Sequence, residues 1–386
     1  MCLPLWLALV LALRAFAPVY QVRFKELFSS RLGHFALEPE MYLAHIEISG
    51  RKAPGVDLFY LDPYRLSNRQ LAKMWARKLH IFRWARPLHC VNKWFAGWER
   101  HEVPWRDVFT ATDRELSLTE PHIAFSAAEI AHGDKCLRAL LGNRTGPIVC
   151  VFSRDSAYLS QHAPHRSWSY HDYRDTNIEN YIPTMEWLAE NGYVVFRMGA
   201  AVKSALPEGL NSNIIDYATH HRSDFMDVFI VFRCAFQIVT PSGPSALGNL
   251  FRKPQVYTNS APLLTVSVPK GHPEELMIPK LYRSEKDGRF LSVKEIVGKG
   301  LATISTLQEL EAANVILTEN DPTDILNLAK EIAGRCTEGV TFSDEDRELQ
   351  RRFWIDAGQD PDAALAIPQP SPSFLRRHKD ILFGTT

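Results

Sequence analysis

The chain has 386 residues, of which 46% are hydrophobic and 23% charged, a composition typical of a folded protein with more than one domain. Lysine plus arginine and aspartate plus glutamate each total 44, so the formal net charge is zero and no long-range field attracts nucleic acid. The six cysteines are scattered without the spacing of a metal site. We therefore expect neither a nucleic-acid partner nor a metal or other cofactor.

Residues 1–25 are predicted to be an appendage to the fold. The segment LPLWLALVLAL, residues 3–13, is apolar, but its roughly eleven residues are too few to cross a bilayer. AFA at residues 15–17 resembles a signal-peptidase site, although no positive charge precedes the apolar run. Arg14, Arg23 and Lys25 then alternate with Phe and Val. This pattern favours an amphipathic helix lying on a membrane or on the protein surface over a cleaved signal.

Residues 26–145 are predicted to form a first domain. A glycine turn opens a helix over residues 31–47, VDLFYLD at 56–62 indicates a buried strand, and Ser67 is predicted to cap the next helix. A further helix is expected within residues 119–141. NRTGP at residues 143–147 is the strongest candidate for a domain boundary.

Residues 146–386 are predicted to form a second domain, in which strands alternate with helices. Strands are expected at IVCVF, YVVF, FQIVT and PQVYTN, and MDVFIVF fits either a strand or a helix. The helix IPTMEWLAENG ends at Gly192. Alternation of this kind is typical of a doubly wound parallel sheet, which binds ligands beyond the carboxyl ends of its strands.

Arginines and small polar residues follow the predicted strands. These residues are Arg154, Asp155 and Ser156 after the first strand, Arg197 and Gly199 after the second, Ser242, Gly243, Pro244 and Ser245 after the third, and Asn259 in the fourth. Guanidinium groups and the N–H groups at the start of a helix are the donors that a diphosphate requires. The chain lacks both the Gly-Lys-Ser/Thr of a Walker loop and a GxGxxG fingerprint, so a nucleotide diphosphate with a leaving group fits better than ATP or NAD.

Several long motifs occur in a fixed order. They are RLGHFALEPEMYL, SRDSAY, DYRDTNIENYIPTMEWLAENGYVVFRMG, IIDYATHHRSDFMDVF, TPSGPSALGNLFRKPQVYTN and ENDPTDILNLAKEI. With these motifs the chain resembles a family of bacterial glycosyltransferases encoded among surface-polysaccharide genes, from Arg31 onward and most densely over residues 149–259. The family is similar to GT-B enzymes, and the donor motifs also resemble those of protein O-fucosyltransferases.

The resemblance implies an α/β architecture of two Rossmann-like domains facing each other across a cleft, with the nucleotide sugar in the C-terminal one. It implies metal-independent transfer from a nucleotide-diphosphate sugar to a surface polysaccharide or lipid-linked acceptor, in the cytoplasm or at the inner face of the membrane. DPD at residues 360–362 has the pattern of a metal motif, but a turn is the better interpretation there. A UDP-sugar 2-epimerase and a non-catalytic nucleotide-sugar binder are the alternatives.

Residue roles follow from this chemistry. The diphosphate is assigned to Arg154 and Arg197, with donors from Ser242, Gly243 and Ser245, while Arg174, Asp175 and Asn177 are placed beside the cleft. Asp216 and Tyr217 are placed to contact base or ribose, with a helix-surface acid as the alternative, and Asp224 to orient an arginine or sugar hydroxyls, or to cap a helix. The base is expected from His34, with Glu38 and Glu40 as carboxylate candidates, because an imidazole titrates near neutral pH.

Overall fold

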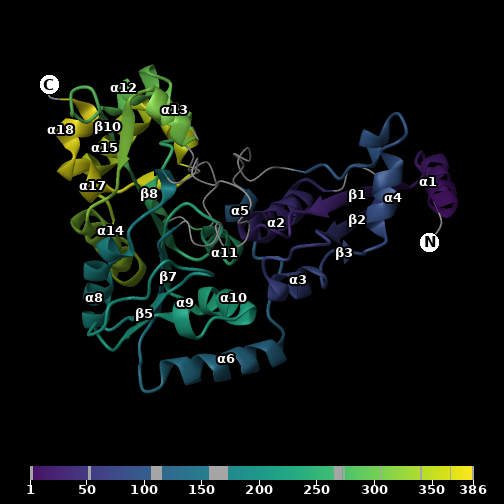
Figure 1. Cartoon of the computed structure of the whole chain (residues 1–386), viewed down its shortest axis with the longest axis horizontal. Helices are drawn as coiled ribbons and strands as arrows, with labels where there is room; N and C mark the ends of the chain where they lie inside the picture. The colour runs from purple at the N-terminus through teal and green to yellow at the C-terminus, as the bar shows by residue number, and fades with distance from the viewer. Residues whose placement is uncertain are drawn as a thin grey trace.

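The protein is described by a computed structural model, which covers residues 3–50, 54–105, 115–155, 173–264, 272, 274–304, 306–339, 341–365 and 367–384. Two separate parallel sheets organise the described chain, one of three strands and one of seven. We call the first sheet and its helices α1 to α4 the N-terminal unit, and the second sheet and its helices the C-terminal unit. Figure 1 shows them side by side along the long axis of the molecule.

The N-terminal unit and the connection that follows it contain short elements. Their bounds are α1 Leu3–Phe16, β1 Gln21–Leu27, α2 Leu32–Ser49, β2 Gly55–Leu61, α3 Arg69–Trp75, β3 His80–Ile81, α4 Ala85–Asn92, η1 Trp98–His101, α5 Glu115–Leu118 and α6 Ala127–Leu141. The sheet has the order β1-β2-β3, and all its pairs are parallel. Side chains that alternate along β1 and β2 cover its two faces, and α1 and α4 pack on the face made by Val22, Phe24 and Leu58.

The predicted appendage differs from the structure in one respect. Its apolar part is a helix, α1, but residues 21–27 are the strand β1 rather than the continuation of an amphipathic helix. Arg23 can lie in a strand because its guanidinium forms a buried ion pair with Asp57 of β2, at 2.6 Å. Among the described residues, no helix combines the length and the apolar character that crossing a bilayer requires.

Two other local predictions of the N-terminal unit are tested. The helix over residues 31–47 and the strand over 56–62 are confirmed as α2 and β2. The next helix is capped by Asn68, whose side chain accepts a hydrogen bond from Leu71 N at 2.9 Å, so the assignment of the cap to Ser67 is wrong. Asn68 occupies the N-cap because its short amide reaches the first turn of α3.

The C-terminal unit contains the remaining elements. The strands are β4 Ile148–Phe152, β5 Val194–Arg197, β6 Ile214–Ile215, β7 Phe236–Val239, β8 Gln255–Ser260, β9 Leu276–Pro279, β10 Leu281–Ser284, β11 Val315–Thr318 and β12 Gln369–Pro370. The helices are η3 Ile178–Tyr181, α8 Ile182–Glu190, α9 Tyr217–His220, α10 Asp224–Arg233, α11 Ser245–Leu250, α12 Val293–Gly298, η4 Leu301–Thr303, α13 Leu307–Ala312, α14 Pro322–Glu338, α15 Asp344–Asp356, α16 Pro361–Ala364, α17 Pro372–Arg377 and α18 Lys379–Phe383.

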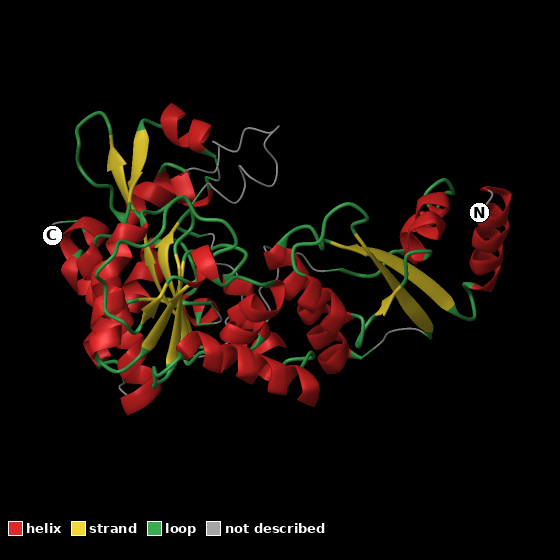
Figure 2. Cartoon of the chain, turned by 60° about the horizontal axis from the view of Figure 1, so that its bottom comes forward, coloured by secondary structure: helices red, strands yellow, loops and turns green. Residues whose placement is uncertain are grey.

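Seven of these strands form one parallel sheet in the order β12-β9-β8-β7-β4-β5-β6. The four predicted strands, β4, β5, β7 and β8, are confirmed, and the segment MDVFIVF is the helix α10. Helices cover the strands in Figure 2, which explains why β4, β5 and β7 are buried along their whole length.

The sheet order creates a switch point between β4 and β7. After β4 the chain adds β5 and β6 on one side, and it then returns to add β7 on the other side. Loops that leave a parallel sheet in opposite directions at a switch point usually frame a ligand-binding crevice, and we call the carboxyl edge beyond β4 and β7 the crevice. The loop of residues 240–245 after β7 and Arg154 after β4 both start at this crevice.

The two units are joined by direct packing as well as by the chain. Helix α6 packs on α10, where a Cβ at Gly133 would lie 2.4 Å from the ring of Phe229, and α2 packs on α11. Figure 1 shows α6 running beneath α10. In space α6 therefore accompanies the C-terminal unit, although it precedes the predicted boundary at residues 143–147.

Candidate active site

The loop after β7 is held by its own hydroxyl groups. Ser242 Oγ donates to Thr240 O at 2.9 Å, and Ser245 Oγ donates to Ser242 O at 2.7 Å. Pro244 precedes α11 with helical backbone angles, and Ser245 N–H donates to Ser242 O. The two serine hydroxyls thus shape the loop. The donors that remain for a ligand are the N–H groups of Ser242 and Gly243, for which no partner occurs among the described residues.

Three cations gather at the same crevice. Arg154 Nη1 contacts Asp175 Oδ1 at 2.7 Å, and Lys280 Nζ donates to Asp175 O at 2.7 Å. The Arg174 guanidinium donates through Nη2 to Pro241 O in the β7 loop, while its Nε is buried and has no hydrogen-bond partner in the described chain. An anion placed here would satisfy this donor and relieve the crowding of positive charge.

The pKa values of Arg174 and Lys280 also favour a bound anion at the crevice. Burial and then the neighbouring Arg154 lower the pKa of Arg174. Burial likewise lowers the pKa of Lys280 from 10.5 to about 8, against the opposing effects of Glu319 and Asp175. Both groups are therefore cations in surroundings that disfavour their charge, a condition that bound phosphate would reverse.

Two hydroxyls at the ends of neighbouring strands complete this edge. Thr240 follows β7 and Ser260 ends β8, and both residues are fully buried. Neither Thr240 Oγ1 nor Ser260 Oγ has a hydrogen-bond partner in the described part of the chain. Buried hydroxyls of this kind are uncommon, and a ligand or water is the usual partner.

His34 and Glu38 form a pair at the start of α2. The His34 Nδ1 to Glu38 Oε1 distance is 2.6 Å, and Trp105 Nε1 donates to the other oxygen of Glu38 at 3.0 Å. Glu38 is buried, whereas a quarter of the His34 side chain is exposed. A carboxylate on Nδ1 favours the tautomer with its lone pair on Nε2, the arrangement of an oriented general base.

A glycine contact brings this pair to the β7 loop. A Cβ at Gly33 would lie 3.1 Å from Gly243 Cα, and a Cβ at Gly243 would lie 3.2 Å from Gly33 N. The two backbones can approach this closely only because both residues are glycine. His34, next to Gly33, therefore lies beside the loop after β7, and the two predicted halves of the site meet.

Glu40 has a different role from the one predicted. It is fully buried, and its Oε1 contacts Arg252 Nη2 at 2.7 Å and His122 Nδ1 at 3.0 Å. Arg252 follows α11 and donates in addition to Leu116 O at 2.7 Å. Glu40 thus fastens α2 to the C-terminal unit. A buried carboxylate that is bonded to an arginine and a histidine is poorly placed to take a proton from an acceptor hydroxyl.

Arg197 and Asp216 do not fit donor binding either. Their side chains form an ion pair at 3.1 Å, Arg197 is 2% exposed, and its Nη2 donates to Ser204 O. Asp216 also accepts from Leu206 N at 2.9 Å, so the pair pins the loop after β5. Gly199 lies in that loop, where a Cβ would meet Val202 Cγ1 at 2.7 Å. This guanidinium is buried with two protein partners, which favours a structural role, and its predicted contact with diphosphate stays a prediction.

Four more predicted residues have structural partners. The Tyr217 hydroxyl is buried and donates to Asp227 Oδ1 at 2.9 Å. Asn177 caps η3 by accepting from Glu179 N at 3.0 Å. Asn259, at a φ of 53°, pairs through Oδ1 with Asn320 N at 2.8 Å. Asp155 accepts from Lys203 N at 3.0 Å. These residues shape the edge of the sheet around the crevice.

The remaining donor-site prediction, Ser156, lies outside the described residues.

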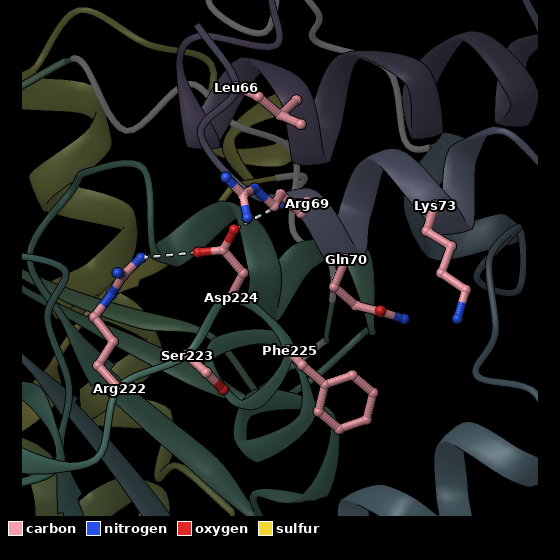
Figure 3. Close-up of a pocket in the computed structure, with 8 residues that line it drawn as sticks. All are labelled: Leu66, Arg69, Gln70, Lys73, Arg222, Ser223, Asp224 and Phe225. Atoms are coloured by element: carbon pink, nitrogen blue, oxygen red, sulfur yellow. Dashed lines mark hydrogen bonds and ion pairs between the residues drawn. The ribbon is translucent and has the colours of Figure 1, made fainter.

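Asp224 lies at a groove between α3 and α10 (Figure 3). Its Oδ2 accepts from Arg69 N at 3.0 Å and its Oδ1 lies 3.4 Å from Arg222 Nη2, while Ser223 is the N-cap of α10. Asp224 thus lies near an arginine, Arg222, whereas its predicted part in donor binding stays a prediction. The groove has a volume of about 670 Å³ and is lined by Leu66, Arg69, Gln70, Lys73, Arg222, Ser223, Asp224 and Phe225. Lys73 pairs with Glu129, and Arg222 pairs with Asp224 and Asp227, so we assign no separate anion site to the groove.

No cluster of three or more metal-binding side chains occurs within the described ranges. The DPD motif is a helix cap, because Asp360 Oδ1 accepts from Asp362 N at 3.0 Å at the start of α16. Sequence reasoning missed Lys280, and it noted Thr240 and Ser260 only as residues at strand ends without giving either a role of its own. The apolar run LMIP before Lys280, which is β9, was the available signal for a further strand end.

The comparisons with known proteins are sparse. No family model matches the chain, and no curated protein does. Among solved structures it is similar to a chain described as a glycosyl transferase family 9 protein from Veillonella parvula DSM 2008. The identity is 10%, the alignment covers 81% of this chain and 97% of that one, and the TM-score is 0.47. Values this low say nothing about activity.

Proposed function

We propose that the protein is a glycosyltransferase that moves a sugar from a nucleotide-diphosphate donor to a hydroxyl of a surface polysaccharide or lipid-linked acceptor, without a metal ion. The contact between Gly33 and Gly243 carries the proposal, because it joins an oriented histidine to a cationic crevice. The motifs shared with polysaccharide glycosyltransferases point to the same reaction class.

The crevice is suited to a departing diphosphate. As the bond between the anomeric carbon and the phosphate oxygen breaks, negative charge grows on the diphosphate. Arg154 and Arg174 approach from the β4 side, and the N–H groups of Ser242 and Gly243 belong to the β7 loop. Fixed donors that are already in place stabilise such charge strongly, which is the role that a metal ion fills in other transferases.

His34 is suited to the acceptor. Its Nε2 would take the proton of the acceptor hydroxyl as that oxygen attacks the anomeric carbon, and Glu38 would stabilise the imidazolium that forms. Trp105 fixes the second oxygen of Glu38, so the carboxylate cannot turn away from the ring. A base in this position suits a single displacement, which inverts the anomeric carbon.

Donor binding is the first test. A panel of nucleoside diphosphates and nucleotide sugars is screened by thermal shift against the wild type, Arg154→Ala and the control Arg283→Ala, an exposed arginine on β10. We expect at least one nucleotide to stabilise the wild type and the control, and Arg154→Ala to lose that stabilisation. The proposal fails if no nucleotide stabilises the wild type.

Catalysis is the second test. His34→Gln should lower the transfer rate by about 10²- to 10⁴-fold while donor affinity is kept. The matched control is His45→Gln on the same helix, because His45 also pairs with a glutamate, Glu115, at 2.8 Å. Release of an epimer or glycal from donor alone would instead identify a 2-epimerase. Donor binding without turnover on any acceptor would indicate a non-catalytic binder.

A further inference from the structure

Helix α1 carries an apolar face that nothing covers within the described residues. Its exposed leucines and phenylalanine are Leu3 at 49%, Leu5 at 46%, Leu9 at 40%, Leu11 at 54% and Phe16 at 69%. The opposite face packs on the N-terminal unit through Val10, Trp6, Leu7 and Leu13. A surface helix normally presents polar residues to water, so an uncovered apolar face of this size indicates an interaction site.

The helix is fastened to the unit and holds no acidic residue. Arg14 is its single charged residue, and Arg14 Nη1 donates to Asn92 Oδ1 at 2.9 Å. The same guanidinium lies 5.4 Å from the centre of the Phe95 ring. The charge of α1 is thus turned toward α4 and the chain that follows it. The exposed face is left wholly apolar in a fixed orientation.

The elements next to α1 are rich in positive charge. Residues 63–98 contain eight lysines and arginines and no acidic residue: Arg65, Arg69, Lys73, Arg77, Lys78, Arg83, Arg86 and Lys93. Arg86 and Lys93 lie on and just after α4, the helix that packs against α1, and both are exposed. Glu99 is the first acid beyond this stretch. Trp84 and Trp94, at the two ends of α4, are 46% and 63% exposed.

We propose that α1 and the α4 segment, residues 83–98, form a docking surface for a bilayer that contains anionic lipid. The leucine face of α1 would enter the boundary between headgroups and acyl chains, and Arg86 and Lys93 would face the lipid phosphates. Tryptophans favour this boundary. A helix of 14 residues is about 21 Å long, which suits lying in the surface and is too short for crossing it.

Charge favours a bilayer over a second copy of the chain. In a two-fold dimer the partner surface would be a second α1, which holds no acidic residue to pair with Arg86 and Lys93. An anionic surface has the complementary charge. Docking does not depend on the chemistry of the crevice, although a lipid-linked acceptor would be presented at the same surface.

Vesicle binding tests the proposal with the full-length protein. Sedimentation is measured with vesicles of phosphatidylcholine containing about one third phosphatidylglycerol, and with phosphatidylcholine alone. The variant Leu5→Glu/Leu9→Glu should bind the anionic vesicles at least about tenfold more weakly than the wild type. The matched control places the same charges on exposed apolar residues of the C-terminal unit, Ile355→Glu/Leu365→Glu, and should bind like the wild type.

A second pair of variants tests the charges. Arg86→Glu/Lys93→Glu should weaken binding to anionic vesicles several-fold and leave binding to neutral vesicles unchanged, whereas the control Lys286→Glu/Lys299→Glu should change neither. Unchanged vesicle binding by the α1 variant would overturn the proposal, and so would a wild-type dimer in light scattering that this variant dissociates.

Two further measurements separate a loss of docking from unfolding of the variant and from failure of the proposed function. If Leu5→Glu/Leu9→Glu unfolds, Leu5→Ser/Leu9→Ser should show the same loss to a smaller extent, and binding equal to the wild type would count against the proposal. Stabilisation of the α1 variant by a nucleotide, measured by thermal shift, reports on the crevice alone. Loss of vesicle binding with that stabilisation kept therefore concerns docking, and the reverse concerns the proposed function.

Discussion

Arg154 and Arg197 occupy similar places in the sequence and opposite situations in the structure. Each lies at the carboxyl end of a buried strand, β4 and β5, in one parallel sheet. Arg197 is buried with Asp216 and Ser204 O as partners. Arg154 also pairs with a carboxylate, Asp175, but it lies at the switch point, next to the incompletely bonded Arg174 and the nearly buried Lys280. An arginine at a strand end thus indicates a ligand when other buried cations crowd it, and a carboxylate partner alone does not decide the matter.

The largest effect is expected at Arg197, where a substitution tests whether this arginine has a structural role. Arg197→Ala leaves Asp216 as an uncompensated carboxylate and should lower the free energy of unfolding by about 3–5 kcal/mol, measured by urea denaturation. Arg197→Leu/Asp216→Leu should recover much of that loss, because it removes both charges. Stability equal to the wild type together with lost nucleotide binding would show that Arg197 is a ligand after all.

At the switch point the expected pattern is reversed. Arg174→Ala should weaken nucleoside diphosphate binding about 10- to 100-fold in calorimetry, since it removes charge-assisted hydrogen bonds to phosphate. The free protein should lose little stability, because the substitution removes a buried cation beside Arg154. A large fall in stability with unchanged affinity would assign Arg174 to the fold instead.

Lys280 is expected to destabilise the free protein and to strengthen nucleotide binding. Burial lowers its pKa from 10.5 to about 8, so the unfolded chain holds this proton over a pH range in which the folded protein has lost it. The free energy of unfolding should therefore rise between about pH 8 and 10.5. Lys280→Met should remove this rise and stabilise the free protein at pH 7 by about 2 kcal/mol, after allowing for the lost hydrogen bond to Asp175 O.

Denaturant unfolding at pH 7 and pH 9.5 measures both effects, and calorimetry should show several-fold weaker nucleotide binding at pH 7. If Lys280→Met is destabilised at both pH values, the lysine is a structural residue in the same sense as Arg197.

The smallest effect is expected at the glycine contact. Gly243→Ala places a Cβ 3.2 Å from Gly33 N, a backbone atom that can move only by shifting α2. We expect a loss of about 1 kcal/mol in stability and a several-fold lower transfer rate. Gly298→Ala is the control, because a Cβ there meets no atom within 4 Å. Equal transfer rates in both variants would mean that the spacing of His34 and the loop does not matter.

Strands β4, β5, β7 and β8 of the C-terminal unit were predictable because their apolar runs are continuous and polar residues mark their ends. β1 was missed because Arg23 and Lys25 interrupt its pattern, and the partner that buries Arg23 is Asp57, 34 residues away. In the same way, nothing near Arg197 in the sequence separates it from Arg154. Each has an aspartate partner about twenty residues further on, and the difference is that Arg154 also lies beside the buried cations Arg174 and Lys280, which only the folded sheet brings together.

The candidate site was predictable in its residue types and not in its geometry. The glycine turn before His34 and the loop of residues 240–245 were each recognised, yet their contact joins segments some two hundred residues apart. Lys280 was missed because only the run LMIP, which follows two glutamates and includes a proline, marks its strand, β9. Local patterns report strand ends and caps, whereas the sheet order decides which of them become neighbours.

Glu40 gives the site a property that the residues lining it do not provide. Its buried contact with Arg252 joins the helix that carries His34 to the chain directly after α11. The distance from the imidazole to the diphosphate loop is therefore set when the protein folds, and no closing motion is needed to assemble base and donor. For the proposed reaction, part of the orientational entropy would then be lost before any substrate arrives, so that donor and acceptor would bind a site whose groups are already in position.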